Sequence, residues 1–281
     1  MSGIIALLTD FGLSDSYVGV MRAVILSIFP AAHLVDLTHA IQPQHIRQAA
    51  IVLHDSYTYF PSGTVFLAVV DPGVGSARKP IAAAAGDYYF VAPDNGLLSY
   101  TLDVLVIQDI IELNNPAYHL PSVSHTFHGR DIFSPAAGYL AAGVPLTALG
   151  TPMQAFRRLP PPRLDISSDA ITGEILYADH FGNLITSIGP LRWTGNHSLS
   201  LTARTGETVG ADLEFDAHKA AVVIGPHRLT SIHHTYSATS TGTALALVGS
   251  SGRLEIAVNG GSAAAQLALH ENPSISLKIG Q

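Results

Sequence analysis

The sequence predicts two domains: an N-terminal α/β domain whose sheet is sandwiched by helices, and a C-terminal all-β, barrel-like domain. Three observations lead to this prediction. The first half alternates short apolar runs with helical periodicity, three consecutive prolines then interrupt the chain, and the second half is rich in Thr, Ser and Gly with alternating apolar residues. We expect the first domain at residues 1–160 and the second at residues 168–281, with the boundary near 158–168.

Composition excludes several classes of protein. The 281 residues include no Cys, 47% are hydrophobic and 12% are charged, which excludes a disordered chain and a disulfide-stapled secreted domain. The net charge of -7 provides no basic surface for nucleic acid. No apolar run approaches the roughly 20 residues that span a membrane, and the N-terminus lacks the pattern of a signal peptide, so we expect a cytoplasmic protein with no membrane partner. So few charges predict exposed apolar surface that an oligomer would cover.

Short apolar runs alternate with helical patterns in the first half. Val20, Ala23, Val24 and Ile28 follow the spacing of one helix face. The predicted strands are Ile4–Leu8, Leu34–Leu37, Val65–Val70, Ile81–Ala85 and Tyr88–Ala92, and the predicted helices are Ser16–Phe29, His45–Phe60 and Asp131–Ala142. Gly86-Asp87 is a hairpin turn pair, and Pro135 is tolerated in the first turn of its helix.

The second half begins after an extended connector. Leu159–Arg163 contains three prolines in a row, which neither a helix nor a central strand accommodates. Alternating segments with one polar face follow and predict strands joined by turns. These segments are Leu199–Thr202, Ala211–Phe215, Leu254–Val258 and Ser274–Ile279.

Carboxylates follow two of the predicted strands. Asp10 comes after the first strand and Asp71 after Val65–Val70. Ligands of open α/β sheets bind at the carboxyl ends of strands, so both are candidate site residues. The structural alternatives are a helix N-cap for Asp10 and a turn-opening residue for Asp71.

A denser polar cluster lies just before the last predicted helix of the first half. Residues 125–131 contain two histidines, an arginine and an aspartate beside a helix N-terminus. His125, His128 and Asp131 could ligate a transition metal, although their spacing on a loop is not diagnostic. Alternatively, Asp131 caps the helix, Arg130 pairs with a carboxylate, and the histidines lie on the surface.

Two segments of the second half are ordinary turns by their composition. Residues 179–183 (DHFGN) and 249–252 (GSSG) each lie beside a predicted strand. The chain has no dinucleotide-binding, P-loop or serine-hydrolase fingerprint, and the lack of Cys excludes thiol catalysis.

Seven blocks together resemble one family, the S-adenosyl-L-methionine hydrolases (adenosine-forming), also called hydroxide adenosyltransferases, which are related to fluorinase and chlorinase. The blocks occur in the family's order and cover nearly the whole chain. They are LTDFG (8–12), YVGVMRA (17–23), DPGVGSAR (71–78), APDNGLL (92–98), FHGRDIFSPAA (127–137), DHFGN (179–183) and SSGRLEIAVNGGSAA (250–264).

The resemblance implies an N-terminal α/β domain, a C-terminal β-barrel, and a homotrimer that binds S-adenosyl-L-methionine between one subunit's first domain and its neighbour's second. It places the family's catalytic triad on Asp71, Arg78 and His128 and its ribose-binding aspartate on Asp10. No cofactor and no metal are implied. The remaining substrate-binding residues that it implies are Phe127, Gly129, Asp179, Phe181, Asn183, Ser250, Ser251, Glu255, Val258 and Gly260.

Departures from the fluorinases disfavour halide as the nucleophile. Fluorinase-type enzymes carry Tyr in place of Asp71 and Ser in place of Gly129, and the insertion that fluorinase has between residues 71 and 92 is missing here. The segment Gln44–Arg47 lacks the acidic pattern expected near the ribose. The expected reaction is attack of an oriented water on C5′, giving adenosine and L-methionine. Two alternatives stay open at this point: a non-catalytic adenosine or S-adenosylmethionine-binding module, and a His/Asp metallohydrolase.

Overall fold

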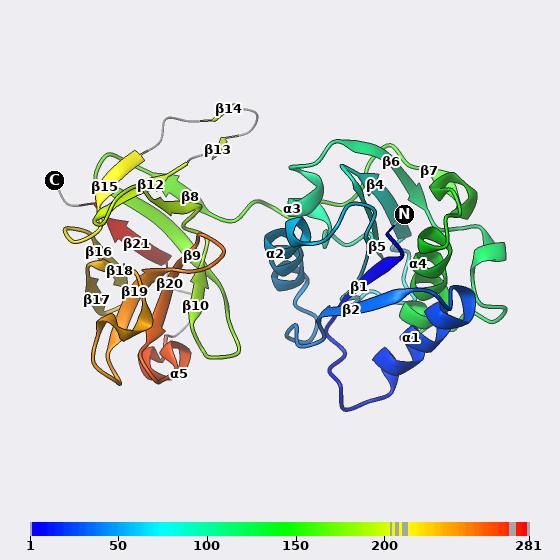
Figure 1. Ribbon diagram of the computed structural model, residues 1–281, viewed down its shortest axis with the longest axis horizontal. Helices are drawn as coiled ribbons and strands as arrows, with labels where there is room; N and C mark the ends of the chain where they lie inside the picture. The colour runs from blue at the N-terminus through cyan, green and yellow to red at the C-terminus, as the bar shows by residue number, and fades with distance from the viewer. Residues whose placement is uncertain (1, 203, 206–207, 210–212, 270–273, 280–281) are drawn as a thin grey trace. The chain divides into compact units, whose positions relative to one another are not determined.

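The chain forms two compact units, residues 1–160 and 161–281 (Figure 1). The structure is a computed structural model, and it describes residues 2–202, 204–205, 208–209, 213–269 and 274–279. Within those residues, no helix combines the length and the apolar character that crossing a bilayer requires.

A seven-stranded mixed sheet organises the N-terminal unit, with strand order β2-β1-β3-β5-β4-β6-β7. Its first four strands pair in parallel, and β4 joins them antiparallel through the predicted hairpin with β5, which is confirmed. The strands are β1 (Ile4–Thr9), β2 (His33–Thr38), β3 (Val65–Val69), β4 (Pro80–Ala85), β5 (Tyr88–Pro93), β6 (Ile107–Glu112) and β7 (Thr151–Pro152).

Helices pack on both faces of this sheet. The strand period of two sends Leu7 into the core with helices α1 and α4, and Leu8 into the core with α2 and α3. Both leucines are fully buried, as expected of central parallel strands. The helices are α1 (Tyr17–Ile28), α2 (Ile46–Ser56), α3 (Ser99–Leu102) and α4 (Ser134–Ala141), with 3₁₀ turns at Tyr57–Tyr59, Pro116–Tyr118 and Leu146–Leu149.

The helix predicted at Asp131–Ala142 begins earlier than expected. A π-helical turn at Gly129–Phe133 precedes α4 directly, so Asp131 lies inside the helical segment and does not cap it. Pro135 lacks an N–H and leaves the carbonyl of Asp131 without its usual helical donor. The amide of Leu120 donates to that carbonyl at 2.9 Å, which explains how the segment tolerates a proline after its first turn.

The C-terminal unit is built mainly of antiparallel strands. Its largest sheet has nine strands in the order β17-β16-β21-β9-β10-β20-β19-β18, with β8 paired to β9. The two edge strands, β17 (His227–Thr230) and β18 (Ile232–His233), are separated only by Ser231, and β17 also contacts β19, so the sheet curls into a nearly closed barrel. The other elements of this sheet are β8 (Leu164–Ile166), β9 (Ala170–Ala178), β10 (Leu184–Thr186), β16 (Ala221–Ile224), β19 (Ala244–Val248), β20 (Leu254–Val258) and β21 (Ser274–Lys278).

The described residues of this unit also form two smaller sheets, a short helix and a 3₁₀ turn. They are β11 (Leu191–Trp193), β12 (Ser198–Leu201) and β15 (Leu213–Asp216), β13 (Arg204–Thr205) with β14 (Thr208–Val209), α5 (Ala263–Leu267), and a 3₁₀ turn at Tyr236–Ala238. The strands predicted at 199–202, 254–258 and 274–279 correspond to β12, β20 and β21. The strand predicted at 211–215 corresponds to β15, and its residues 211–212 lie outside the described residues.

Candidate active site

Asp10 and Asp71 lie at the same edge of the N-terminal sheet. Strands β1 and β3 are parallel neighbours, and their register pairs Thr9 with Val69, so both aspartates follow adjacent strand ends. The N-cap alternative for Asp10 is wrong, because Ser16 occupies the N-cap position of α1. The Oδ2 of Asp10 instead accepts a hydrogen bond from the backbone N–H of Gln44 at 2.7 Å.

Asp71, Arg78 and His128 form one hydrogen-bonded chain. The Nε of Arg78 donates to Asp71 Oδ1 at 2.9 Å, and its Nη2 donates to Asp71 Oδ2 and, at 2.8 Å, to Nδ1 of His128. The side chains of Asp71 and Arg78 are each only 6% exposed. A bidentate, buried pair of this kind fixes both side chains in place. The imidazole of His128 is the last member of this hydrogen-bonded series.

The contact with Arg78 determines the protonation state of His128. Because a guanidinium can only donate, Nδ1 of His128 must accept, and the neutral ring therefore carries its proton on Nε2. Burial and the charge of Arg78 lower the pKa of His128 below its usual value, although Asp71 and Asp131 oppose the shift. The triad thus contains a neutral imidazole with one N–H that can donate to a ligand.

The three loops that carry these residues converge on one another. Gly75, at φ +77°, approaches His125 so closely that a Cβ there would lie 2.5 Å from the His125 carbonyl oxygen, so only glycine fits. The ring of Phe127 packs edge-on against Phe11 and Tyr17, with centroids 6.0 and 5.2 Å away. The candidate site is therefore bordered by aromatic rings next to Asp10.

Asp131 has a structural role in this arrangement. It is fully buried, and it accepts hydrogen bonds from Arg130 Nε at 2.6 Å, from Arg130 Nη2 at 3.1 Å and from the Ser124 amide at 2.8 Å. Burial favours its neutral form, but these hydrogen bonds outweigh burial and lower the pKa of Asp131. Within the part of the chain that the structure describes, no three His, Cys, Asp or Glu side chains gather as a metal site, so His125, His128 and Asp131 do not form the proposed ligand set.

In the C-terminal unit, Asp179 organises the hairpin loop between β9 and β10. Its Oδ1 accepts from the amides of Phe181 and Asn183 at 2.9 and 2.8 Å, and its Oδ2 accepts from the Asn183 side chain at 3.0 Å. The segment is thus an ordinary turn, as its composition indicates. The turn also holds Asn183 in a buried position and leaves the ring of Phe181 73% exposed.

Four of the predicted substrate-binding residues line one pocket of this unit. The pocket has a volume of about 480 Å³, and its lining is mostly apolar. It is lined by Phe181, Asn183, Tyr236, Val258, Gly260 and Gly261. An exposed ring, a buried amide and backbone groups of a strand end are suited to a flat, nitrogen-containing aromatic group.

Glu255 lies buried beside this pocket. The hydroxyl of Tyr236 donates to Glu255 Oε2 at 3.3 Å. Burial raises the pKa of Glu255, and the nearby charge of Asp179 adds to the shift, while the hydrogen bond from Tyr236 opposes it. Gly249 makes room for this side chain, because a Cβ there would lie 1.6 Å from Glu255 Oε1.

The sequence did not indicate every residue of the candidate site. Ser250 and Ser251 are exposed in the turn before β20 and are not among the residues that line the pocket. Tyr236 lines the pocket but escaped notice, because its Ser- and Thr-rich surroundings resemble any loop. Phe11 and Tyr17 belonged to recognised blocks, yet only the ring contacts reveal that they form a cluster with Phe127.

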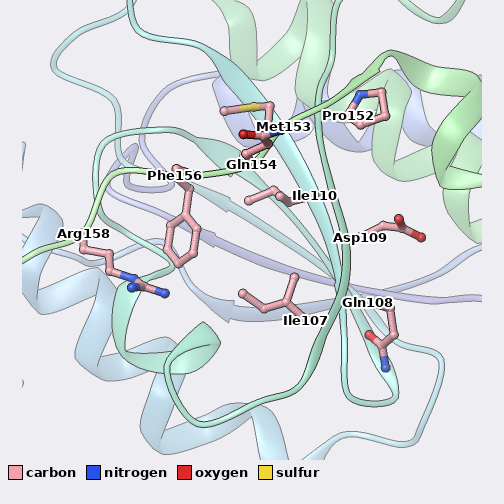
Figure 2. Close-up of a pocket in the computed structure, with 10 residues that line it drawn as sticks. Ile107, Gln108, Asp109, Ile110, Pro152, Met153, Gln154, Phe156 and Arg158 are labelled. Carbon is pink, nitrogen blue, oxygen red and sulfur yellow. The ribbon is translucent and has the colours of Figure 1, made fainter. Parts of the chain in front are cut away.

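Another pocket of the N-terminal unit, about 380 Å³ in volume, lies beside strand β6 (Figure 2). The ring of Phe156 and the side chain of Ile107 border it, and Arg158 Cζ lies 4.8 Å from the Phe156 centroid. None of the predicted site residues lines this pocket. It is therefore distinct from the candidate active site.

Comparisons with known proteins define the class to which this chain belongs. Residues 5–150 match the SAM hydroxide adenosyltransferase N-terminal domain, and residues 173–276 match the C-terminal domain of the same family. The two matches define a protein with two domains. The hydrogen-bonded residues Asp71, Arg78 and His128 lie in the first of them. The chain belongs to the SAM hydroxide adenosyltransferase family.

Individual relatives agree with this assignment. The chain is 39% identical to the (R)-S-adenosyl-L-methionine hydrolase of Thermus thermophilus, over 96% of this chain and 97% of the relative. It is 29% identical to the fluorinase of an Actinoplanes species, over 66% and 71% of the two chains. A crystal structure of an uncharacterized conserved protein from Thermotoga maritima superposes with a TM-score of 0.82, at 34% identity, over 97% of this chain and 99% of the other.

Proposed function

We propose that this chain hydrolyses S-adenosyl-L-methionine to adenosine and L-methionine, with Asp71, Arg78 and His128 orienting the attacking water. The hydrogen-bonded chain through these three side chains is the observation that carries the proposal. Support also comes from the two matched family domains and from full-length relatives that are named as (R)-S-adenosyl-L-methionine hydrolases.

The chemistry explains why positioning is the main demand on the protein. The bond between C5′ and the sulfonium sulfur breaks, and methionine leaves as a neutral thioether that needs no proton. Water is a poor nucleophile, so its oxygen must be held in line with C5′ at about 3 to 3.5 Å, and such positioning contributes roughly 7 to 11 kcal/mol. The bond between oxygen and C5′ forms, and the water loses one proton.

The geometry of the triad suits this task. His128 presents an Nε2–H that can donate to the oxygen of the water, and Asp71 presents carboxylate oxygens that can accept its protons. Arg78 locks both in place through donors that are already engaged. General-base assistance of this kind contributes about 10² to 10⁴ in rate. Water and substrate balance the reaction, so the proposal needs no cofactor.

The substrate would contact both kinds of domain. In this proposal Asp10 binds the ribose, and Phe127 and Gly129 with the C-terminal pocket of Phe181, Asn183, Val258 and Gly260 hold the adenosine. Asp179, Ser250 and Ser251 would face the methionine end, and Glu255 would lie beside the adenosine pocket, next to Tyr236. We propose a homotrimer in which one subunit's residues 1–160 and its neighbour's residues 168–281 complete the site. The exposure of Leu13 (72%) and Phe181 (73%) supports an assembly that covers them.

The direct test incubates the purified protein with S-adenosyl-L-methionine in H₂¹⁸O and analyses the products by mass spectrometry. Adenosine carrying one ¹⁸O at the 5′ position, with one equivalent of methionine, is the expected result. Adenosine binding without turnover would instead identify a binding module, and turnover that a chelator abolishes would overturn the proposed role of the triad. Size-exclusion chromatography with light scattering tests the trimer separately.

A further inference from the structure

His39 holds both ends of the segment that carries Asp10. Its Nδ1 lies 2.8 Å from the hydroxyl oxygen of Thr9, and its backbone carbonyl accepts from the amide of Gly12 at 2.8 Å. Asp10 and Phe11 lie between these two contacts. A residue that is 27 positions away from Gly12 in sequence therefore fixes a four-residue loop from two sides.

The hydrogen bonds around His39 determine which ring nitrogen of the neutral imidazole carries the proton. Asp36 Oδ1, 3.1 Å from His39 Nε2, can only accept, so Nε2 carries the ring proton and Nδ1 accepts. The hydroxyl of Thr9 must then donate to Nδ1. The same hydroxyl oxygen accepts from the amide of Phe11 at 3.2 Å, so each donor of the chain has its acceptor.

This chain of hydrogen bonds is buried at one end and anchored at the other. Thr9 is 0% and His39 is 5% exposed, whereas Asp36 reaches the surface and pairs with Arg22 on helix α1. Burial, assisted by the charge of Arg22, lowers the pKa of His39 to about 4, so the ring is neutral at physiological pH. A protonated ring would donate from Nδ1 as well, and the hydroxyl proton of the fully buried Thr9 would then need another acceptor.

The position of Asp10 depends on the same loop. The backbone N–H of Gln44 donates to Asp10 Oδ2, and Gln44 itself adopts the left-handed conformation at φ +67°. Among the described residues, no hydrogen bond to Asp10 Oδ1 is present. One carboxylate oxygen is thus tied to the protein, and the other can bind a hydroxyl group of a ligand.

We propose that His39, through Thr9, is a positioning residue that fixes Asp10 for recognition of the hydroxyl groups of a ribose. This inference rests on the proposed function, because that function makes Asp10 the ribose ligand. It extends that function from Asp10 to the residues behind it: His39 and Thr9 set how strongly the site prefers nucleosides with free sugar hydroxyls. The class of ligand is a ribonucleoside or its sulfonium conjugate.

The test compares binding of adenosine and 2′,3′-dideoxyadenosine by calorimetry, in the full-length wild type and in the variants Thr9→Val, Thr9→Ser and Asp10→Ala. Valine keeps the shape of threonine but removes the hydroxyl, and serine keeps the hydroxyl. We expect the wild type to prefer adenosine at least tenfold, Asp10→Ala to lose the preference, Thr9→Val to reduce it to about threefold or less, and Thr9→Ser to retain most of it.

Equal weakening of both ligands in a folded Thr9→Val protein would overturn the proposal, since a merely structural role predicts that result. Equal binding of both nucleosides by the wild type would overturn it as well. Failure of the proposed function gives a different pattern, namely intact discrimination between the nucleosides without any hydrolysis of S-adenosyl-L-methionine.

A second measurement needs no folded Thr9→Val protein. In ¹⁵N-histidine-labelled wild type, the His39 ring, assigned by the signal that disappears in His39→Gln, should be neutral at pH 7 with its proton on Nε2. A ring that is charged, or protonated on Nδ1, would overturn the proposed chain of donors.

Discussion

Each unit buries a carboxylate beside a candidate ligand site, but the two units treat that carboxylate differently. In the N-terminal unit, Asp71 is paired with the guanidinium of Arg78 through two hydrogen bonds. In the C-terminal unit, burial raises the pKa of Glu255 and the nearby carboxylate of Asp179 adds to the shift, although the hydrogen bond from the Tyr236 phenol opposes it.

The difference indicates a division of labour. A paired, fixed charge can orient a polar molecule such as water, because its hydrogen-bonding direction is set before the ligand arrives. A carboxyl that is pushed toward its neutral form suits the wall of a pocket for an uncharged aromatic group. The chemistry is thus expected in the N-terminal unit and the recognition of the base in the C-terminal unit.

The largest effect is expected for Asp71→Asn. Asparagine has nearly the same shape and keeps one acceptor for Arg78 where aspartate has two, but it cannot take up a proton from water. We expect turnover to fall by about 10² to 10⁴ with little change in KM, measured as adenosine release. Asp109→Asn, an exposed change on β6, is the matched control. Equal losses in turnover and in substrate binding would contradict the proposed contrast with Glu255, since Asp71 would then act in substrate recognition and not in orienting water.

The second prediction concerns pH and the N-terminal unit. His39 has a pKa of about 4 when folded and about 6.5 when unfolded, so the unfolded chain binds more protons between these values. The contribution of His39 to the free energy of unfolding should therefore fall by roughly 3 kcal/mol as pH drops from 6.5 to 4, measured by urea denaturation of the wild type and of His39→Gln. His39→Gln should make the fall in unfolding free energy with decreasing pH shallower, whereas His125→Gln, at an exposed position, should preserve it.

The third prediction concerns the exposed ring of the C-terminal pocket. Stacking of a base on an aromatic ring contributes about 1 to 3 kcal/mol, so Phe181→Ala should weaken adenosine binding by about 5- to 150-fold. Stability of the subunit should change little, because the ring is 73% exposed. Tyr59→Ala removes a ring that is 79% exposed in the other unit and should leave calorimetric affinity unchanged. Undiminished affinity in Phe181→Ala would place the base elsewhere.

The smallest effect is expected for Glu255→Gln. A raised pKa means that the folded state favours the protonated carboxyl of Glu255. The side chain therefore lowers the free energy of unfolding once the pH rises above the pKa that Glu255 has in the unfolded chain. The variant should therefore melt slightly higher than wild type at pH 7 and equally at pH 4, where both residues are neutral. Glu214→Gln, on the exposed edge of β15, is the control. If Glu255→Gln melted at a lower temperature than the wild type at pH 7, Glu255 would stabilise the fold as a charged group, as the ion-paired Asp71 does, and the contrast between the two carboxylates would be wrong.

Sequence patterns predicted most elements of the N-terminal unit because each is locally specified. The apolar spacing in Val20–Ile28 and the turn pair Gly86-Asp87 depend only on near neighbours, and both elements formed as predicted. The predicted start of the helix at Asp131 was wrong, because the helical segment begins at Gly129 and is stabilised by a contact from outside the helix. The amide of Leu120 satisfies the carbonyl that Pro135 cannot, and no local rule predicts that contact.

The sequence alone determined the family and the order of the two domains, and it predicted the candidate site residues. Only the tertiary structure decided how these residues meet. Arg78 and His128 are 50 positions apart in sequence, and no local pattern indicates that their nitrogens lie 2.8 Å apart. Likewise, nothing local links Thr9 to His39, or Tyr236 to the wall that Phe181 and Gly260 share. Hydrogen bonds between distant segments depend on how the strands pair and the loops pack, and that information resides in the folded chain as a whole.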